Sequence, residues 1–219
     1  MTKLMIVSDL HLEFEYQELD TLDADILVIA GDLAPYAKLD LLDKFFSTIK
    51  IPVVYVPGNH EYYGGGIYDR YAHSGVFVLD NTFVELDGLK FAGSTMWTNP
   101  SYNTTRQIND MWQIIGLDTI EEYKDTMAFF ESDFEADVIV THFPPTMDSI
   151  ARKYLGNTLN DYFTHNRPDL VGIHNEKLWI HGHTHNTSIL ELNGVDIVCN
   201  PKGYYNENPA YNRGYIYEY

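Results

Sequence analysis

The stretch LMIVSDLH at residues 4–11 joins an apolar run, Leu4 to Val7, directly to Asp9 and His11. A short, continuous apolar run predicts a buried β-strand, and the two polar side chains would follow its carboxyl end. Four further stretches have the same form: ILVIAGD at 26–32, VVYVPGNHE at 53–61, VIVTH at 138–142 and LWIHGHTH at 178–185. Because open α/β sheets gather their functional loops at the carboxyl ends of the strands, these polar side chains should meet in space.

The residues that follow these strands have the chemistry of a metal centre. Seven of them offer a carboxylate, amide or imidazole ligand: Asp9, His11, Asp32, Asn59, His142, His183 and His185. One tetrahedral ion needs about four ligands, so two ions that share a carboxylate fit the set better. Oxygen and imidazole ligands without a thiolate suit manganese, iron, zinc or nickel, and disfavour copper(I) or an iron–sulfur cluster. The sequence therefore predicts two divalent transition-metal ions and leaves their identity open.

The ordered pattern D-x-H, G-D, G-N-H-E, H and G-H-x-H over residues 9–185 resembles the calcineurin-like metallophosphoesterase superfamily. Each motif alone is weakly specific, whereas the full set in this order is strongly specific. The resemblance implies that one ion is held by Asp9, His11, Asp32 and His185, and the other by Asp32, Asn59, His142 and His183. Asp32 would then bridge the two ions. In the same pattern His60 is not a ligand and lies over the substrate, either as proton donor to the leaving oxygen or as a transition-state contact.

The chemistry of two adjacent ions is consistent with these roles. Divalent ions about 3.5–4 Å apart can share a water, lower its pKa, and clamp the attacking and leaving oxygens of an in-line displacement at phosphorus. A hydroxide bridging the two metals would be the nucleophile. The departing oxygen needs a proton, and a histidine titrates near neutral pH, so His60 is the expected general acid. These roles predict hydrolysis of a phosphoester or phosphoanhydride.

The second motif departs from a form that is common in the superfamily. Many members continue it as G-D-x-x-D-R, whereas this chain reads GDLAPY at 31–36, with Pro35 in place of the second aspartate and Tyr36 in place of the arginine. In the protein serine/threonine phosphatases that aspartate orients the catalytic histidine and that arginine grips phosphate. This chain is therefore less similar to that branch. The partner that fixes the tautomer of His60 is not identified by the sequence.

Composition limits the class of protein and its partners. The 219 residues are 45% hydrophobic, which suits one globular domain that buries about 70% of its surface. With 14 basic and 32 acidic residues the net charge is −18, so a nucleic acid polymer is a poor partner. Two divalent ions carry more positive charge than Asp9 and Asp32 offset, so the pocket itself can still attract phosphate. The expected partner is a small phosphate ester, and the oligomeric state stays open.

Cysteine usage and hydropathy favour a cytoplasmic protein without a membrane span. Cys199 is the single cysteine, so no intramolecular disulfide is possible, and its place in the run Val195 to Cys199 suits a buried strand residue. The apolar run at Leu4 to Val7 is shorter than the core of a signal peptide. No stretch approaches the roughly 18 apolar residues of a membrane helix.

The order of elements predicts a single α/β domain over residues 1–219, with two packed mixed β-sheets flanked by helices in an α/β/β/α sandwich. Apolar periodicity predicts helices over 39–49 and about 120–130. Further strands are expected at 76–79, 82–86, 89–93, 195–199 and 214–219, with hairpin turns at Asp87-Gly88 and Asn193-Gly194. Residues 96–134 form an insert near the active site, and Gly64-Gly65-Gly66 a mobile loop.

The remaining histidines and Glu61 favour structural interpretations. His181 lies within a strand, and His73, His165 and His174 lack a motif, so surface positions or local hydrogen bonds are expected for those three. Glu61 follows the motif histidine at a turn and should make a structural hydrogen bond. The 17 tyrosines suit packing better than base stacking, because few basic residues lie among them.

Substrate choice is expected to depend on the insert and the glycine loop, because the metal ligands contact only the phosphoryl group. The insert residues proposed to contact the leaving group, or in the case of the tryptophans to anchor the insert, are Trp97, Tyr102, Asn103, Arg106 and Trp112. The segments 199–204 and 207–209, with Asn109-Asp110, resemble the tail and insert of a bacterial subgroup of these phosphohydrolases. The leading function is hydrolysis of a small phosphodiester, phosphomonoester or nucleotide. A non-catalytic scaffold and a nuclease are the alternatives.

Overall fold

Eleven β-strands and five α-helices occupy the part of the chain that the structure, a computed structural model, describes: residues 1–65 and 73–219. The strands are β1 (Lys3–Val7), β2 (Ile26–Ala30), β3 (Val53–Val56), β4 (Val76–Val78), β5 (Thr82–Leu86), β6 (Leu89–Ser94), β7 (Val138–Thr141), β8 (Leu178–His181), β9 (Ser188–Leu192), β10 (Val195–Cys199) and β11 (Ile216–Glu218). The α-helices are α1 (Leu39–Thr48), α2 (Tyr102–Thr105), α3 (Asp110–Gln113), α4 (Thr119–Phe130) and α5 (Asn160–Phe163). Gly66 of the expected glycine loop lies outside the described residues.

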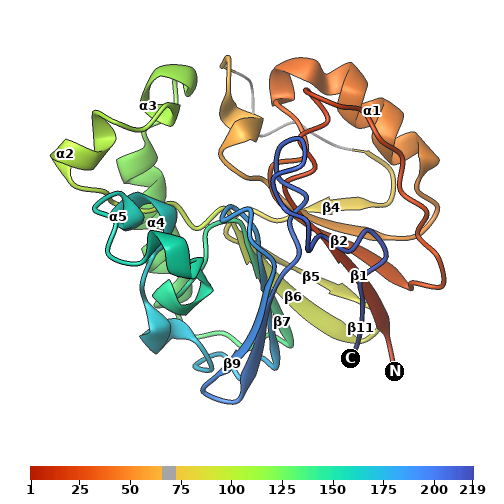
Figure 1. Cartoon of the computed structure of the whole chain (residues 1–219). Coiled ribbons are helices and arrows are strands. Elements are labelled where there is room, and N and C mark those ends of the chain that lie inside the picture. Colours follow the sequence, from red (N-terminus) through yellow and green to blue (C-terminus); the bar gives the residue numbers. More distant parts are fainter. Residues whose placement is uncertain (66–72) are drawn as a thin grey trace.

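The strands form two mixed sheets. One has the order β11-β1-β2-β3-β4 and the other β5-β6-β7-β8-β10-β9. Strands β1 to β4 are parallel, as are β6, β7, β8 and β10, and the antiparallel strands lie at the edges. The two chain ends lie close together (Figure 1), because β11 pairs with β1 and Leu4 lies opposite Tyr217.

The central strands of each sheet are buried on both faces, which explains the continuous apolar runs of the sequence. Along β1, Leu4 packs into the core between the two sheets, whereas Met5 points to the opposite face and packs with Phe45 of α1. On the outer face of the second sheet, Trp179 of β8 packs with Phe130 of α4. Figure 1 shows α1 on one side of the strands and α4 and α5 on the other. The predicted α/β/β/α sandwich is confirmed.

The two helices predicted from periodicity are α1 and α4. Asp118 caps the start of α4, where its carboxylate accepts hydrogen bonds from the backbone N–H groups of Ile120 and Glu121. The helices α2, α3 and α5 were not predicted. Each has four residues, which is about one turn and too short to leave a periodic pattern.

Candidate metal centre

All five polar motifs lie at the carboxyl ends of strands, where the two sheets meet. The loops after β1, β2 and β3 come from one sheet, and those after β7 and β8 from the other. Hydrogen bonds tie the loops together: the backbone N–H of Asp9 donates to the carbonyl of Gly31 at 2.9 Å, and that of His183 donates to Asp9 Oδ1 at 3.0 Å. Motifs far apart in sequence therefore form one site.

Several residues of this site have a left-handed backbone conformation. Five of the predicted ligands have positive φ angles: Asp9 (53°), His11 (47°), Asp32 (54°), His183 (68°) and His185 (46°). Such a conformation costs a residue other than glycine about 1–3 kcal/mol, and it gathers at active sites and ligand clamps. The concentration of strain on these five residues indicates that the loops are shaped for function.

Two motif glycines allow the loops to approach closely. A Cβ atom at Gly58 would lie 2.2 Å from Asp32 Oδ1, and one at Gly182 would lie 2.6 Å from the carbonyl oxygen of Ala30 and 2.7 Å from Asp9 Oδ2. No side chain fits at either position without moving a carboxylate or the backbone. Glycine is therefore required by the space around the two aspartates.

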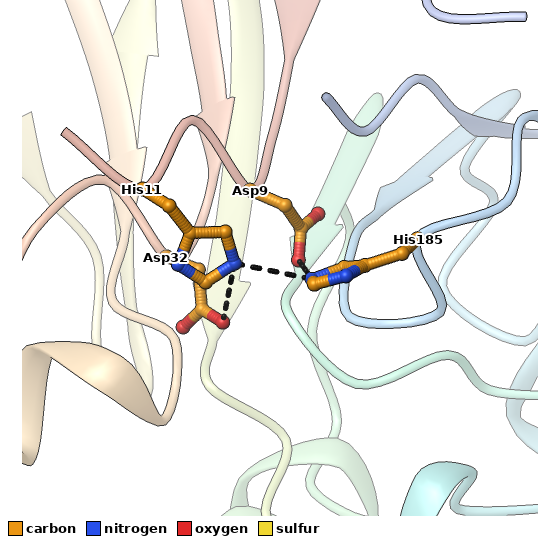
Figure 2. Close-up of side chains that lie close together, drawn as sticks. All are labelled: Asp9, His11, Asp32 and His185. Carbon is orange, nitrogen blue, oxygen red and sulfur yellow. Dashed lines mark hydrogen bonds and ion pairs between the residues drawn. The ribbon is translucent and has the colours of Figure 1, made fainter. Parts of the chain in front are cut away.

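Four buried or nearly buried side chains form the first cluster, Asp9, His11, Asp32 and His185, whose ligand atoms all lie within 4.8 Å of one another. Figure 2 shows the Nε2 atoms of His11 and His185 pointing toward each other, 3.1 Å apart. His185 Nε2 lies 3.2 Å from Asp9 Oδ1, and His11 Nε2 lies 3.8 Å from Asp32 Oδ2. This is the first of the two ligand sets expected from the sequence.

Asp32 also belongs to a second buried cluster, with His142 and His183, whose ligand atoms again lie within 4.8 Å of one another. His142 Nε2 lies 3.4 Å from Asp32 Oδ1 and 2.9 Å from the amide oxygen of Asn59. The structure thus brings all seven residues together, with the Asp32 carboxylate between the two groups.

The tautomers of the two histidines in the first cluster suit the binding of a cation. Glu13 Oε1 lies 3.1 Å from His11 Nδ1, and Glu207 Oε2 lies 2.6 Å from His185 Nδ1. A carboxylate only accepts, so each Nδ1 carries a hydrogen, and Nε2 carries the lone pair when the ring is neutral. The Nε2 lone pairs of the two rings then lie close to each other and to the carboxylates of Asp9 and Asp32. A divalent ion would stabilise this arrangement.

The second cluster has the same property. The carbonyl oxygen of Ala30 accepts from His142 Nδ1 at 2.9 Å, which leaves Nε2 facing the oxygens of Asp32 and Asn59. His183 Nε2 is buried and has no hydrogen-bond partner among the described residues. A buried ring nitrogen without a partner is costly in a protein interior, and coordination would satisfy it.

The carboxylates attract protons onto neighbouring imidazoles. Burial would lower the pKa of His185, but Asp9 and Glu207 together raise it to about 10. Burial would likewise lower the pKa of His142, but Asp32 raises it to about 9. His183 differs, because burial and the proximity of His142 hold its pKa well below the ordinary value. A cation entering the site would therefore displace protons, as metal binding to histidine commonly does.

His60 lies beside both clusters. Its backbone N–H donates to Asp32 Oδ1 at 2.9 Å, and its ring stacks on that of Tyr63 with centroids 4.2 Å apart. Its Nδ1 lies 3.0 Å from Glu13 Oε1, and its Nε2 lies 3.2 Å from the Tyr204 hydroxyl. Burial would lower the pKa of His60, but the net effect of Asp32 and Glu13 is to raise it. Contacts with Tyr63, Glu13 and Tyr204 therefore fix the position of the His60 ring.

The insert reaches the site through Asp110. The Tyr63 hydroxyl donates to Asp110 Oδ1 at 2.5 Å, and the Tyr162 hydroxyl donates to its other oxygen. Asp110 thereby supports the ring that stacks on His60. Burial raises the pKa of this carboxyl group.

A cavity of about 260 Å³ opens beside the two clusters. Its lining includes His60, Tyr204, Tyr162 and the insert residues 107–110. Arg106 and Trp112 are not among the lining residues, and Trp112 is 75% exposed. Trp97 is 2% exposed and packs in the core of the second sheet, which is the anchoring role considered for it.

Glu61 holds together the loops that carry the predicted metal ligands. Its Oε2 accepts from the backbone N–H groups of Asp32 at 3.0 Å and Gly58 at 2.8 Å. Its Oε1 accepts from the N–H of Leu33 at 2.7 Å and the hydroxyl of Tyr55 at 2.6 Å. The side chain is fully buried, so its role is structural, as expected.

Replacing Glu61 by glutamine should therefore destabilise the fold. Whichever way the amide turns, its NH₂ group faces at least one backbone N–H, which loses its acceptor. An unsatisfied buried donor costs about 1–3 kcal/mol, so we expect the free energy of unfolding to fall by about 2 kcal/mol in denaturant titrations. Glu191→Gln, at an exposed position on β9, is the matched control and should change it by less than about 0.5 kcal/mol. Equal stability of the two variants would contradict this role.

The other histidines only partly match their expected roles. His181 is buried and lies 2.9 Å from the Ser149 hydroxyl, and His174 lies near two backbone carbonyls, so both are structural. His165 is half-buried, its ring stacks on Tyr123, and burial lowers its pKa to about 4.

Four residues around the site were not assigned roles from the sequence: Glu13, Asp110, Tyr204 and Glu207. Three of them lie in the segments whose resemblance to a bacterial subgroup was noted, so that similarity was the available signal. Glu13 follows His11 by two residues and has no motif of its own.

Comparison with known proteins shows the family to which this chain belongs. A family model described as calcineurin-like phosphoesterase matches residues 2–187. The uncharacterized protein L509 of Acanthamoeba polyphaga mimivirus is 30% identical, over 97% of this chain and 95% of its own length. The chain belongs to the calcineurin-like phosphoesterase family and is a metal-dependent phosphoesterase.

Two solved structures share the fold. The phosphopantetheinyl hydrolase PptH of Mycobacterium tuberculosis is 18% identical with a TM-score of 0.65, over 94% of this chain and 91% of that one. The protein TT1561 of Thermus thermophilus is 17% identical with a TM-score of 0.53, over 91% of this chain and 89% of that one. At such identities the likeness concerns the fold alone. Within the described residues, no helix is long and apolar enough to cross a membrane.

Proposed function

We propose that this phosphoesterase holds two divalent transition-metal ions and hydrolyses a small phosphodiester, phosphomonoester or nucleotide. The ligands of one ion would be Asp9, His11, Asp32 and His185, and those of the other Asp32, Asn59, His142 and His183. The observation that carries the proposal is the position of the Asp32 carboxylate, one oxygen of which faces His11 and the other His142. A single carboxylate shared in this way suits a pair of ions better than one ion.

The chain's own residues have distinct tasks in this proposal. Two bound ions would supply a water of lowered pKa and a positive clamp on the phosphoryl group. His60 is the proposed proton donor to the leaving oxygen, because it lines the cavity beside the clusters and its Nε2 has only the Tyr204 hydroxyl as a hydrogen-bond partner among the described residues. Tyr204 lines the same cavity, and its hydroxyl is the proposed contact for a phosphoryl oxygen.

The size and charge of the site support a small substrate. The cavity of about 260 Å³ is slightly smaller than the range of about 300–1,000 Å³ usual for drug-sized ligands. A net charge of −18 opposes a long polyanion, which makes a nuclease the weaker alternative. The scaffold alternative is weaker too, because all seven ligand residues and His60 are in place around Asp32.

The test combines metal content with turnover of a chromogenic monoester and its diester. Purified protein should hold close to two transition-metal ions per chain, and should hydrolyse p-nitrophenyl phosphate or bis-p-nitrophenyl phosphate. Removing the ions with a chelator should abolish turnover, and adding manganese, zinc or nickel back should restore it. Bound metal without turnover of either ester would favour the scaffold. Preferential cleavage of an oligonucleotide would favour the nuclease.

A further inference from the structure

One buried carboxylate oxygen lies between two histidine rings that have different tasks. Glu13 Oε1 is 3.1 Å from His11 Nδ1 and 3.0 Å from His60 Nδ1. The Glu13 side chain is only 6% exposed, and its other oxygen has no hydrogen-bond partner among the described residues. Both contacts of this carboxylate are therefore made by a single atom.

These contacts fix the tautomer of both rings. A carboxylate oxygen only accepts, so each Nδ1 must carry a hydrogen, and in a neutral ring the lone pair then lies on Nε2. In His11 that Nε2 faces His185 Nε2 at 3.1 Å, in the first metal cluster. In His60 it faces the Tyr204 hydroxyl at 3.2 Å, at the cavity. Glu13 thus directs one ring toward the ion and the other toward the substrate.

We propose that Glu13 is a positioning residue that holds His11 in its metal-binding tautomer and His60 in its proton-donating orientation. The proposal deepens the proposed function and rests on it. Many relatives carry an aspartate at the position of Pro35, and Glu13 would supply the missing carboxylate in this chain. Here the carboxylate comes from the loop after β1, and one oxygen serves both the metal cluster and the proton donor.

A second carboxylate in the site provides a matched comparison. Glu207 Oε2 lies 2.6 Å from His185 Nδ1, so it supports the other histidine of the same cluster. Within the described part of the chain, no hydrogen bond joins Glu207 to His60, whereas Glu13 has one. Removing either carboxylate should weaken binding of the same ion, but only removal of Glu13 should affect His60. Glu15, an exposed carboxylate paired with Lys202, is a control on the same loop as Glu13.

The direct readout is the His60 tautomer, measured without turnover. In metal-free protein with ¹⁵N-labelled histidine, at a pH where the ring is neutral, long-range ¹⁵N–¹H spectra distinguish Nδ1–H from Nε2–H. The His60 signals are assigned by their loss in His60→Gln. We expect the Nδ1–H form in the wild type, in Glu15→Ala and in Glu207→Ala, and a shift toward Nε2–H in Glu13→Ala. An unchanged tautomer in Glu13→Ala would overturn the proposal even if the protein hydrolysed no ester.

The kinetic readout is a double-mutant cycle between Glu13 and His60, at saturating metal. Glu13→Ala should lower kcat about 10- to 100-fold for an alkyl phosphate ester, whose leaving group needs a proton, and much less for a p-nitrophenyl ester. In a His60→Ala background the same change should have little further effect on kcat. Glu207→Ala should leave the ratio of the two esters unchanged. Equal slowing of both esters, or full additivity with His60→Ala, would overturn the positioning role.

Metal titrations separate this role from direct coordination, because His11, Glu13 and His60 are themselves close enough to hold an ion. Because a positioning residue is not itself a ligand, its loss should lower the metal affinity and leave the number of bound ions unchanged. Glu13→Ala and Glu207→Ala should each weaken the binding of one ion about 10- to 100-fold. Loss of one ion per chain in both Glu13→Ala and His60→Ala, with full occupancy in Glu207→Ala, would instead make Glu13 a ligand and overturn the proposal. Failure of the proposed function is a different result, since wild-type protein would then neither retain metal nor hydrolyse ester.

Discussion

Asp32→Asn should lower the occupancy of both metal sites. The Asp32 carboxylate faces His11 with Oδ2 and His142 with Oδ1, so a bridge between two ions would be lost at both ends. Residues that merely support a ligand change metal affinity about 10- to 100-fold, and replacing a shared ligand should exceed that range. Elemental analysis of purified protein should therefore find about two ions per chain in the wild type and almost none in the variant, with turnover lost in parallel.

Asp9→Asn is the matched control for this experiment. Asp9 is equally buried, but it belongs to the first cluster alone, so its loss should empty one site and spare the other. The comparison distinguishes a bridging carboxylate from a general effect of removing a buried charge. One tightly held ion in the wild type, unaffected by Asp32→Asn, would contradict the two-ion proposal.

The strands that lead to the proposed metal ligands could be predicted because their environment is simple. In β1 and β2 both faces of the sheet are buried, so nearly every position is apolar and the polar residue that ends the run is conspicuous. The order of strands in the sheets could not be predicted. It depends on contacts between distant segments, such as the pairing of β11 with β1, which leaves no local pattern.

The residues around His60, the proposed proton donor, were harder to predict than the proposed metal ligands. Glu13 and Tyr204 meet His60 only because two loops from opposite ends of the chain fold over the site. Nothing in the spacing of either residue marks that contact. Tyr36, where many relatives carry arginine, is 4% exposed and packs in the core beneath α1, so this chain uses that position for packing. The second motif can lack its second aspartate because Glu13, from another loop, contacts His60 instead.

His60→Ala should slow ester hydrolysis about a hundredfold or more and leave both ions bound. A positioned general acid contributes about 10²–10⁴ in rate, and the His60 ring nitrogens face Glu13 and Tyr204, neither of which is a proposed ligand. The ring also packs edge-on against that of His11, with centroids 4.4 Å apart, but no hydrogen bond joins the two rings among the described residues. Metal content and turnover should be measured on the same samples. The fall should be steepest for alkyl esters and smallest for p-nitrophenyl esters, which leave without a proton.

The choice of variants decides what this experiment reports. His60→Gln keeps a polar side chain but no group that titrates near neutral pH, so it should be nearly as slow as His60→Ala if proton donation is the task. A glutamine variant that retained most of the activity would point instead to a transition-state contact, because an amide N–H can donate a hydrogen bond without transferring a proton. His73→Ala, which lies outside the site, should keep full activity and metal. Loss of an ion in either His60 variant would make His60 a ligand, grouped with His11 and Glu13, and the task of the acid would pass to Tyr204 as the remaining hydroxyl beside it.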